Sequence, residues 1–266
     1  MSKYITHFQT EAAYQSALPS LDLPNVSLVD ELGEVHYHRA LYGAHAGDIA
    51  LYDVANAQKI VVTKDDWNLT SYPTVSYPIV GVVVADESAA GCKVCAVTNI
   101  NTDGTPTTNN KYYGWQNTNF DWGLTKYSTS TDAKTDFNGK ANTTTIINAI
   151  KAYDLAHSTD SITGCASQCI QLYAPTGTVA GEWYIPACGE MKMAYDNFTV
   201  INTTLNKIHT ADSSLANEWS KFTSYITSSE KDDSDVWRTS YDRVLTVDYK
   251  QKNYNDIGIL IAFYNL

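Results

Sequence analysis

The chain of 266 residues is poor in charged side chains, and poorest in basic ones. Charged residues make up 18% of it, with 18 Lys and Arg against 29 Asp and Glu, for a formal net charge of −11. Binding to a phosphate backbone needs clustered Lys and Arg. The composition therefore argues against a nucleic-acid-binding protein, and we expect no nucleic-acid partner.

Long hydrophobic runs are also missing. A helix that spans a bilayer needs about 20 consecutive apolar residues, and no run in this sequence approaches that length. Residues 1–5 lack the apolar segment of a signal peptide. We therefore expect no membrane insertion and folding in a cytoplasm. A protein of this kind that acts outside the cell would leave by lysis or on a particle.

The five cysteines are an odd number, which fits reduced thiols better than a disulfide framework. Cys92 and Cys95 fall in a strand-like run, where positions three apart face opposite sides. Cys165 and Cys169 are spaced to share one face of a helix, and they form a three-thiolate site with Cys188 only if the fold brings all three together. We expect ordinary thiols and no metal.

Motifs for calcium are incomplete. The run Lys231–Asp235 is rich in oxygen ligands but lacks the glycine and the terminal glutamate of an EF-hand. The E-P-N, Q-P-D and W-N-D motifs of calcium-dependent sugar binding are absent. His36 and His38 share one face of a predicted strand, either as exposed polar residues or, in a trimer, as six nitrogens for an octahedral metal. We expect no cofactor.

Aromatic residues are plentiful: the chain has 19 Tyr and 6 Trp, set among many small polar residues. This mixture is typical of loop-rich β proteins and of recognition surfaces.

Periodicity predicts a mixed α and β protein. Apolar residues of one face predict a helix over 142–153 with Asn142 or Thr143 as its N-cap, and further helices over 162–173 and 191–208, the last broken near Phe198. Alternating and continuous apolar runs predict a hairpin of 49–51 with 60–62 and strands at 80–84, 94–97 and 257–264, with a long polar loop at 99–110.

The most informative stretch is Gly181–Met191, which reads GEWYIPACGEM. It predicts a buried strand that ends at Pro186, then a turn and a helix whose first turn carries Glu190. Downstream lie Trp219, the block Tyr225–Glu230 (YITSSE) and Trp237. We expect the Trp side chains to anchor the core. Glu190 and Glu230 follow small residues at turns, so we expect them to accept backbone N–H bonds rather than act as a glycosidase pair.

The order of these blocks resembles the C-type-lectin-fold domains related to the formylglycine-generating enzyme. The resemblance covers about the last hundred residues and extends loosely to residues 136–143. It implies an α+β fold with a twisted antiparallel sheet, flanking helices and long loops. The cysteine pair of the enzyme has no counterpart that a flanking motif identifies here, which argues against carrying over the oxidase activity.

The N-terminal segment has Phe8, Thr10, Ala13 and Tyr14, then the runs 23–27 (LPNVS) and 35–37 (VHY). This pattern resembles the N-terminal segments of virion proteins from crAss-like bacteriophages of gut Bacteroidetes. The resemblance implies an attachment or trimerisation arm, which we place over residues 1–42. The strand patterns predict a small β-rich region over 43–98, and the lectin-like domain is expected over 99–266. The arm contains too little apolar surface to form its own core, so we expect it to dock on sister chains or a capsid partner. The residues expected to make these contacts are Phe8, Tyr14, Leu23, Val26, Val35, His36 and His38.

These observations predict a non-enzymatic virion protein, a head fibre or decoration protein that displays a lectin-like domain to a bacterial surface glycan or protein. The alternatives are a bacterial surface adhesin-like domain and a formylglycine-generating-type oxidase. Rings and charges gather between residues 231 and 254, where they either bind a ligand, solvate a hairpin or pack on a neighbouring subunit. The predicted binding residues are Asp232, Asp233, Asp235, Arg238, Tyr241, Asp242, Arg243, Tyr249 and Tyr254.

Overall fold

A computed structural model describes most of the chain. The described residues are 28–29, 35–36, 43–86, 92–109, 112–115, 120–157, 165–219, 223–242, 244–252 and 257–266. The chain divides into two units, residues 1–43 and 44–266.

The first unit contains one described pair of strands. Strand β1 (Leu28–Val29) pairs antiparallel with β2 (Val35–His36), and Leu28 lies opposite His36. This places Val35 and His36 in a strand, as predicted. The other expected contact residues of the arm, Phe8, Tyr14, Leu23, Val26 and His38, lie outside the described residues.

One five-stranded sheet of the second unit is antiparallel and has the order β14-β6-β5-β3-β4. It is built from β3 (Ile49–Asp53), β4 (Gln58–Val62), β5 (Ile79–Val83), β6 (Lys93–Cys95) and β14 (Phe263–Asn265). The predicted hairpin is confirmed, since Ile49 pairs with Val62 and Leu51 with Ile60. Because β14 joins strands from the range 43–98, the two predicted domains share this sheet.

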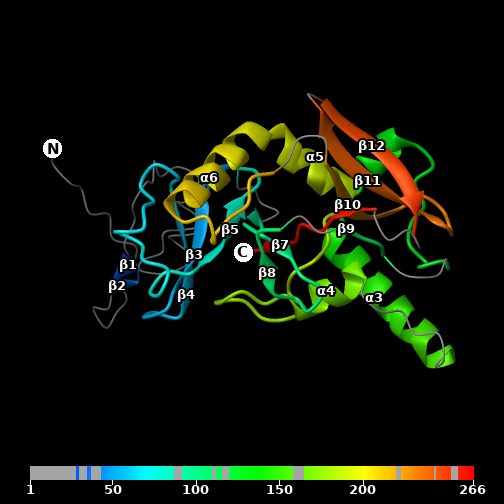
Figure 1. The fold of residues 1–266 in the computed structure, drawn as a ribbon, viewed down its shortest axis with the longest axis horizontal. Coiled ribbons are helices and arrows are strands. Elements are labelled where there is room, and N and C mark those ends of the chain that lie inside the picture. The colour runs from blue at the N-terminus through cyan, green and yellow to red at the C-terminus, as the bar shows by residue number, and fades with distance from the viewer. Residues whose placement is uncertain are drawn as a thin grey trace. The chain divides into compact units, whose positions relative to one another are not determined.

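The other five-stranded sheet has the order β12-β11-β10-β13-β9, with β10 and β13 parallel and the other pairs antiparallel. Its strands are β9 (Tyr112–Tyr113), β10 (Ser224–Glu230), β11 (Asp235–Asp242), β12 (Val244–Gln251) and β13 (Gly258–Ile259). Figure 1 shows β11 and β12 as a long hairpin at one end of this unit.

Two sequence predictions of strands were wrong. The run 257–264 is two short strands, β13 and β14, in different sheets, and Leu260 to Ala262 are buried where the chain crosses between them. Trp183–Ile185 forms only an isolated bridge, in which the Tyr184 N–H donates to Phe263 O (2.9 Å). A continuous apolar run is compatible with one strand, with two short strands or with an isolated bridge. Residues that are buried on all sides show no periodicity that would distinguish these structures.

The predicted polar loop 99–110 also contains structure. Strand β7 (Asn99–Ile100) pairs with β8 (Pro106–Thr107), and the turn between them is closed by a bond from the Gly104 N–H to Asn101 O (2.9 Å). Gly104 has a φ of 81°, which favours glycine.

Five helices lie in the described ranges of the second unit. They are α2 (Ser130–Ala133), α3 (Gly139–Ala156), α4 (Ala166–Leu172), α5 (Cys188–Asp196) and α6 (Phe198–Ala211). The predicted break near Phe198 is confirmed at Asn197. The predicted N-cap of α3 was wrong: the helix begins earlier, at Gly139, with Asn138 as its N-cap, so Asn142 lies within the first turn and donates its side-chain bond to Asp136.

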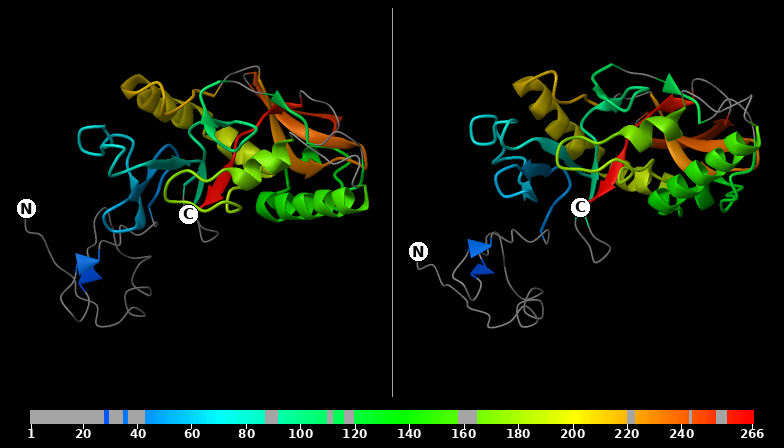
Figure 2. Two further views of the ribbon diagram at one scale, coloured as in Figure 1. Left: turned by 60° about the horizontal axis from the view of Figure 1, so that its bottom comes forward. Right: turned by 90° about the horizontal axis from the view of Figure 1, so that it is seen from below.

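Helices cover both sheets. In Figures 1 and 2, α6 runs along the β3–β5 sheet, and α3 lies beside the β10–β12 sheet. Ile201, Leu205 and Ile208 of α6 pack with Ile49 and other residues of the β3–β5 sheet, whereas α3 contributes its buried isoleucines to a second cluster. The described part of this unit is therefore α+β with largely antiparallel sheets. None of its described helices combines the length and apolar character of a bilayer crossing.

Candidate functional site

The sequence blocks that carried the resemblance meet at one buried junction. The Asp136 carboxylate accepts bonds from the Asn138 N–H (3.0 Å), the Asn142 side chain (2.8 Å) and the Ser229 hydroxyl (2.7 Å). Ser229 Oγ in turn accepts the Cys188 N–H at the start of α5 (2.9 Å). Hydrogen bonds thus join the three blocks, and those to the Asp136 carboxylate are charge-assisted.

Glu190 completes this junction from inside α5. Its Oε2 accepts the Ala187 N–H (2.9 Å), while its Oε1 lies 3.2 Å from the Tyr184 hydroxyl and 3.0 Å from Lys93 Nζ. Burial raises the pKa of Glu190, and the nearby Lys93 ammonium offsets part of that rise. The expected bond to a backbone N–H is confirmed, and it caps the helix where its dipole favours a carboxylate.

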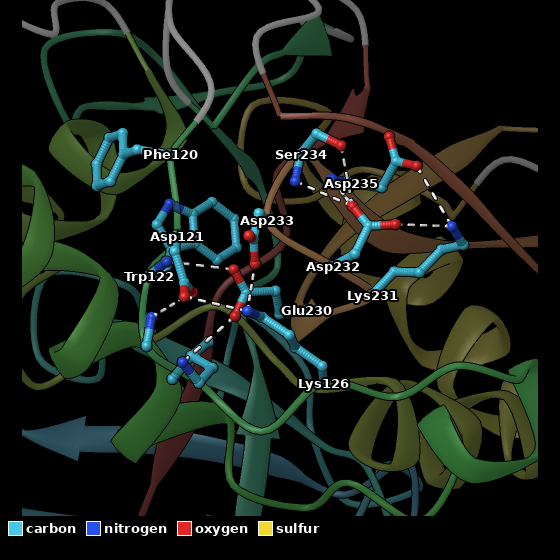
Figure 3. A network of polar contacts seen from close by, with 12 residues as sticks. Phe120, Asp121, Trp122, Lys126, Glu230, Lys231, Asp232, Asp233, Ser234 and Asp235 are labelled. Carbon is cyan, nitrogen blue, oxygen red and sulfur yellow. Dashed lines mark hydrogen bonds and ion pairs between the residues drawn. The ribbon is translucent and has the colours of Figure 1, made fainter.

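A second buried carboxylate, Glu230, forms an ion pair with Lys252, and both side chains are fully buried. Glu230 also accepts the N–H groups of Trp122 (3.2 Å) and Leu124 (3.3 Å), as predicted for a structural carboxylate. Lys252 Nζ donates further bonds to the carbonyls of Phe120 and Asp233, each at 3.0 Å. Figure 3 shows Glu230 beside Trp122.

The Glu230–Lys252 pair ties three chain segments together. Lys252 Nζ can donate three hydrogen bonds, and Glu230, Phe120 and Asp233 take all three. The ammonium also lies over the Trp122 ring, 4.1 Å from its centroid. This arrangement links Phe120 and Asp233 to the Glu230–Lys252 pair, and it occupies both charged groups with protein partners.

The loop between β10 and β11 is closed by Asp232. One of its oxygens accepts the N–H groups of Ser234 (2.9 Å) and Asp235 (2.8 Å), and the other accepts Lys231 Nζ (2.9 Å). Burial acts to raise the pKa of Asp232, but these bonds outweigh it and hold the pKa below its ordinary value. Figure 3 shows this cluster next to the one around Glu230. In the loop 231–235, whose sequence resembles a calcium loop, the Asp232 carboxylate is thus occupied by hydrogen bonds from the loop itself.

Beside these two clusters lie three exposed charges, Asp121, Lys126 and Asp233, and one exposed ring, with Lys231 and Asp232 partly buried next to them. Lys126 bridges Asp121 (3.0 Å) and Asp233 by ion pairs. The Tyr249 ring on β12 is 51% exposed, and Lys231 Nζ lies 3.9 Å from its centroid. We call these residues, Asp121, Lys126, Lys231, Asp232, Asp233 and Tyr249, the candidate binding surface.

The strand register divides the other predicted binding residues between two faces. Tyr249 lies opposite Trp237, whereas Arg238 pairs with Asp248 and so faces the other side of the hairpin. Arg238 donates to both oxygens of Asp248 at 2.8 Å and to Ile257 O at 3.2 Å. These bonds occupy its guanidinium within the chain. Asp235 lies 3.4 Å from Lys231.

The remaining predicted binding residues receive no site geometry. Tyr241 and Asp242 belong to β11, opposite Leu245 and Val244. Arg243 and Tyr254 lie outside the described residues.

The thiols are buried in separate places. Cys92 and Cys95 belong to different core clusters, as expected for opposite faces of a strand, while Cys165 and Cys169 share one cluster and Cys188 lies in a third. The three-thiolate site is therefore not assembled. Within the ranges that the structure describes, no three His, Cys, Asp or Glu side chains gather as metal ligands.

Sequence reasoning missed Lys93, Lys126 and Lys252. Lys93 lies between the two cysteines of a predicted strand, and Lys126 and Lys252 lie in no motif. Their partners are far along the chain: Tyr184 is 91 residues from Lys93, Asp233 is 107 from Lys126, and Glu230 is 22 from Lys252. The sequence does not indicate that such a residue is paired or buried, because a lone lysine is ordinarily a solvated side chain.

Comparison with known proteins adds little to this geometry. No protein-family model matches the chain, and no curated protein matches its sequence. A crystal structure of a fimbrial protein from Bacteroides ovatus ATCC 8483 is similar over 92% of this chain and 49% of that chain, with 13% identity and a TM-score of 0.44. The chain thus spans about half the length of that fimbrial protein, and a likeness of this size identifies no family for it.

Proposed function

We propose that this chain is a non-enzymatic virion protein of a bacteriophage related to the crAss-like group, a head fibre or decoration protein. In this proposal residues 44–266 form a C-type-lectin-like domain that binds a glycan or protein on the bacterial surface. The N-terminal arm, including Val35 and His36, attaches the domain to the capsid and assembles it as a trimer.

The observation that carries the proposal is that the polar residues fall into two groups, one buried and structural and the other exposed. Asp136, Glu190 and Glu230 are buried and bonded to backbone N–H groups. Tyr249 and the charges around Lys126 are exposed instead. A scaffold whose motif residues support its loops, with an exposed aromatic ring among charges, fits a displayed binding module better than an enzyme.

The binding part of the proposal is tested on cells. Fluorescently labelled full-length protein is incubated with a panel of gut Bacteroidetes strains, and bound label is measured. We expect Tyr249→Ala to reduce binding at least about tenfold, as for the loss of an interface hot spot. The matched control is Leu155→Ala, which removes a side chain that is 87% exposed on α3 and should leave binding unchanged.

Thermal melting of both variants separates a lost contact from a lost fold. Reduced binding with an unchanged melting temperature supports the candidate binding surface. Equal binding of wild type and Tyr249→Ala would reject this surface, and failure of the wild type to bind any strain would reject host attachment.

The virion assignment has a separate test. Antibodies raised against residues 44–266 should decorate purified particles in electron micrographs, at the head if the chain is a head fibre. Labelling of bacterial cells in the absence of phage would favour the surface-adhesin alternative and overturn the virion assignment.

A further inference from the structure

Two neighbouring strands of the β14-β6-β5-β3-β4 sheet hold an unusual pair of side chains. Lys93 on β6 and Asn265 on β14 are register partners across the two paired strands. Lys93 Nζ lies 3.0 Å from Asn265 Oδ1, although 172 residues separate them in sequence. Neighbouring positions on paired strands keep an amine and a carboxamide in contact without any loop movement.

Glu190 and Tyr184 lie next to this pair of side chains. Glu190 Oε1 lies 3.0 Å from Lys93 Nζ, and the Glu190 side chain is almost fully buried. The Tyr184 hydroxyl lies 2.9 Å from Asn265 Oδ1 and 3.1 Å from Lys93 Nζ. The amine therefore has a base within reach, and the amide oxygen has a hydrogen-bond donor.

We propose that Lys93 and Asn265 form an intramolecular isopeptide bond, with Glu190 as the proton carrier and Tyr184 as the donor to the amide oxygen. Lys93 passes a proton to Glu190, and the neutral amine attacks Cγ of Asn265. The Tyr184 O–H bond to Oδ1 stabilises the negative charge that develops there. The Cγ–Nδ2 bond then breaks, and Glu190 delivers protons to the departing nitrogen.

The step balances without an oxidant or a cofactor. One C–N bond forms between Nζ and Cγ, and one C–N bond to Nδ2 breaks. Two protons leave Nζ and pass through Glu190 to the leaving group, which departs as ammonium. The Glu190 carboxylate is regenerated, and the chain becomes lighter by one ammonia.

The surroundings suit each part of this step. Burial raises the pKa of Glu190, so this carboxylate accepts a proton more readily than an exposed one. Burial next to Glu190 also raises the pKa of Tyr184, which keeps its hydroxyl protonated as a donor. Asn265 itself is exposed, which leaves the departing nitrogen a route to solvent.

The bond would fix an edge strand. β14 is three residues long and is the last strand of the sheet, where it pairs with β6 and, among the described residues, meets only the isolated bridge at Tyr184 on its other side. A covalent link between β6 and β14 would keep this strand in place under mechanical load or protease attack. The inference rests on this geometry and is independent of the proposed virion function.

The test is mass spectrometry of the full-length protein. The purified chain is denatured, its thiols are alkylated, and its intact mass is compared with that of Lys93→Arg, which shares the same N-terminal processing. Arg keeps the positive charge beside Glu190 but cannot form the bond. We expect the wild type to lack one ammonia relative to its sequence mass, and Lys93→Arg to have its full mass.

Digestion then identifies the bond itself. We expect a branched peptide that joins Lys93 to Asn265, with no trypsin cleavage after Lys93, and slower formation of this peptide in Tyr184→Phe. A wild-type chain of full mass would overturn the proposal. Loss of ammonia without the branched peptide, as in succinimide formation at another asparagine, would also overturn it, as would an equal loss in Lys93→Arg.

Discussion

The buried Glu230–Lys252 pair allows a sharp test of the energetics of this fold. Replacing Lys252 with Met keeps most of the aliphatic length of the side chain and removes the ammonium. Glu230 then remains as a buried carboxylate whose polar partners are the N–H groups of Trp122 and Leu124. The carbonyls of Phe120 and Asp233 lose the donor that joins them.

The expected cost follows from these losses. Removing one partner of a buried ion pair destabilises a protein by about 3–5 kcal/mol, because it leaves an uncompensated buried charge. In a domain of this size about 1 kcal/mol lowers the melting temperature by 2–4 °C. We therefore expect the Lys252→Met melting temperature to fall by about 6–20 °C.

The matched control is Lys192→Met. Lys192 pairs with Asp196 on α5, but both side chains are largely exposed. An exposed pair four residues apart on a helix contributes about 0.3–0.5 kcal/mol, so this variant should melt within about 2 °C of the wild type.

A double-mutant cycle isolates the pair. Glu230→Gln removes the buried charge, so Glu230→Gln/Lys252→Met should be more stable than Lys252→Met alone, with a coupling energy of at least about 1 kcal/mol. Denaturant unfolding, followed by fluorescence, measures all four proteins. A Lys252→Met variant that loses less than about 1 kcal/mol would refute the reasoning, since the ammonium would then not hold the loops together.

Four further predictions follow from the packing and the charges. Trp183 and Trp237 are 2% and 4% exposed, so replacing either by Ala should cost about 3–5 kcal/mol; a melting temperature within about a degree of wild type, well under the shift such a loss implies, would place that ring on the surface. Gly139→Ala should cost about 1–3 kcal/mol in the same assay, because a Cβ there would overlap the Glu190 side chain and the Ala187 nitrogen; an unchanged midpoint would contradict this packing. The pKa of Asp232 lies below its ordinary value of 3.8, so the folded protein binds fewer protons than the unfolded one and loses stability as the pH falls below 3.8; Asp232→Asn should lose stability less steeply there, and parallel curves would reject the assignment. Thiol titration of the freshly folded protein after denaturation should find all five cysteines reactive, and a count of three or one would show a disulfide.

Local sequence was sufficient for many elements of this fold. The isoleucines at 146 and 150 predicted the buried face of α3, and the break before Phe198 was visible in the pattern that α5 and α6 share. The roles of Glu190 and Glu230 as acceptors of backbone N–H bonds were also predictable. Periodicity and turn chemistry depend on neighbouring residues, so a single sequence records them.

Tertiary structure alone decided which distant groups meet. Nothing near Lys252 indicates that it lies in the core with Glu230, and nothing near Asn265 indicates a contact with Lys93. The run 257–264 looked like one strand because a segment buried in two sheets and a segment buried in one sheet have the same run of apolar residues. The division of Arg238 and Tyr249 between opposite faces was set by the β11–β12 register. Ion pairs, strand partners and faces depend on long-range packing, and an apolar or charged residue has the same local pattern whichever partner the fold supplies.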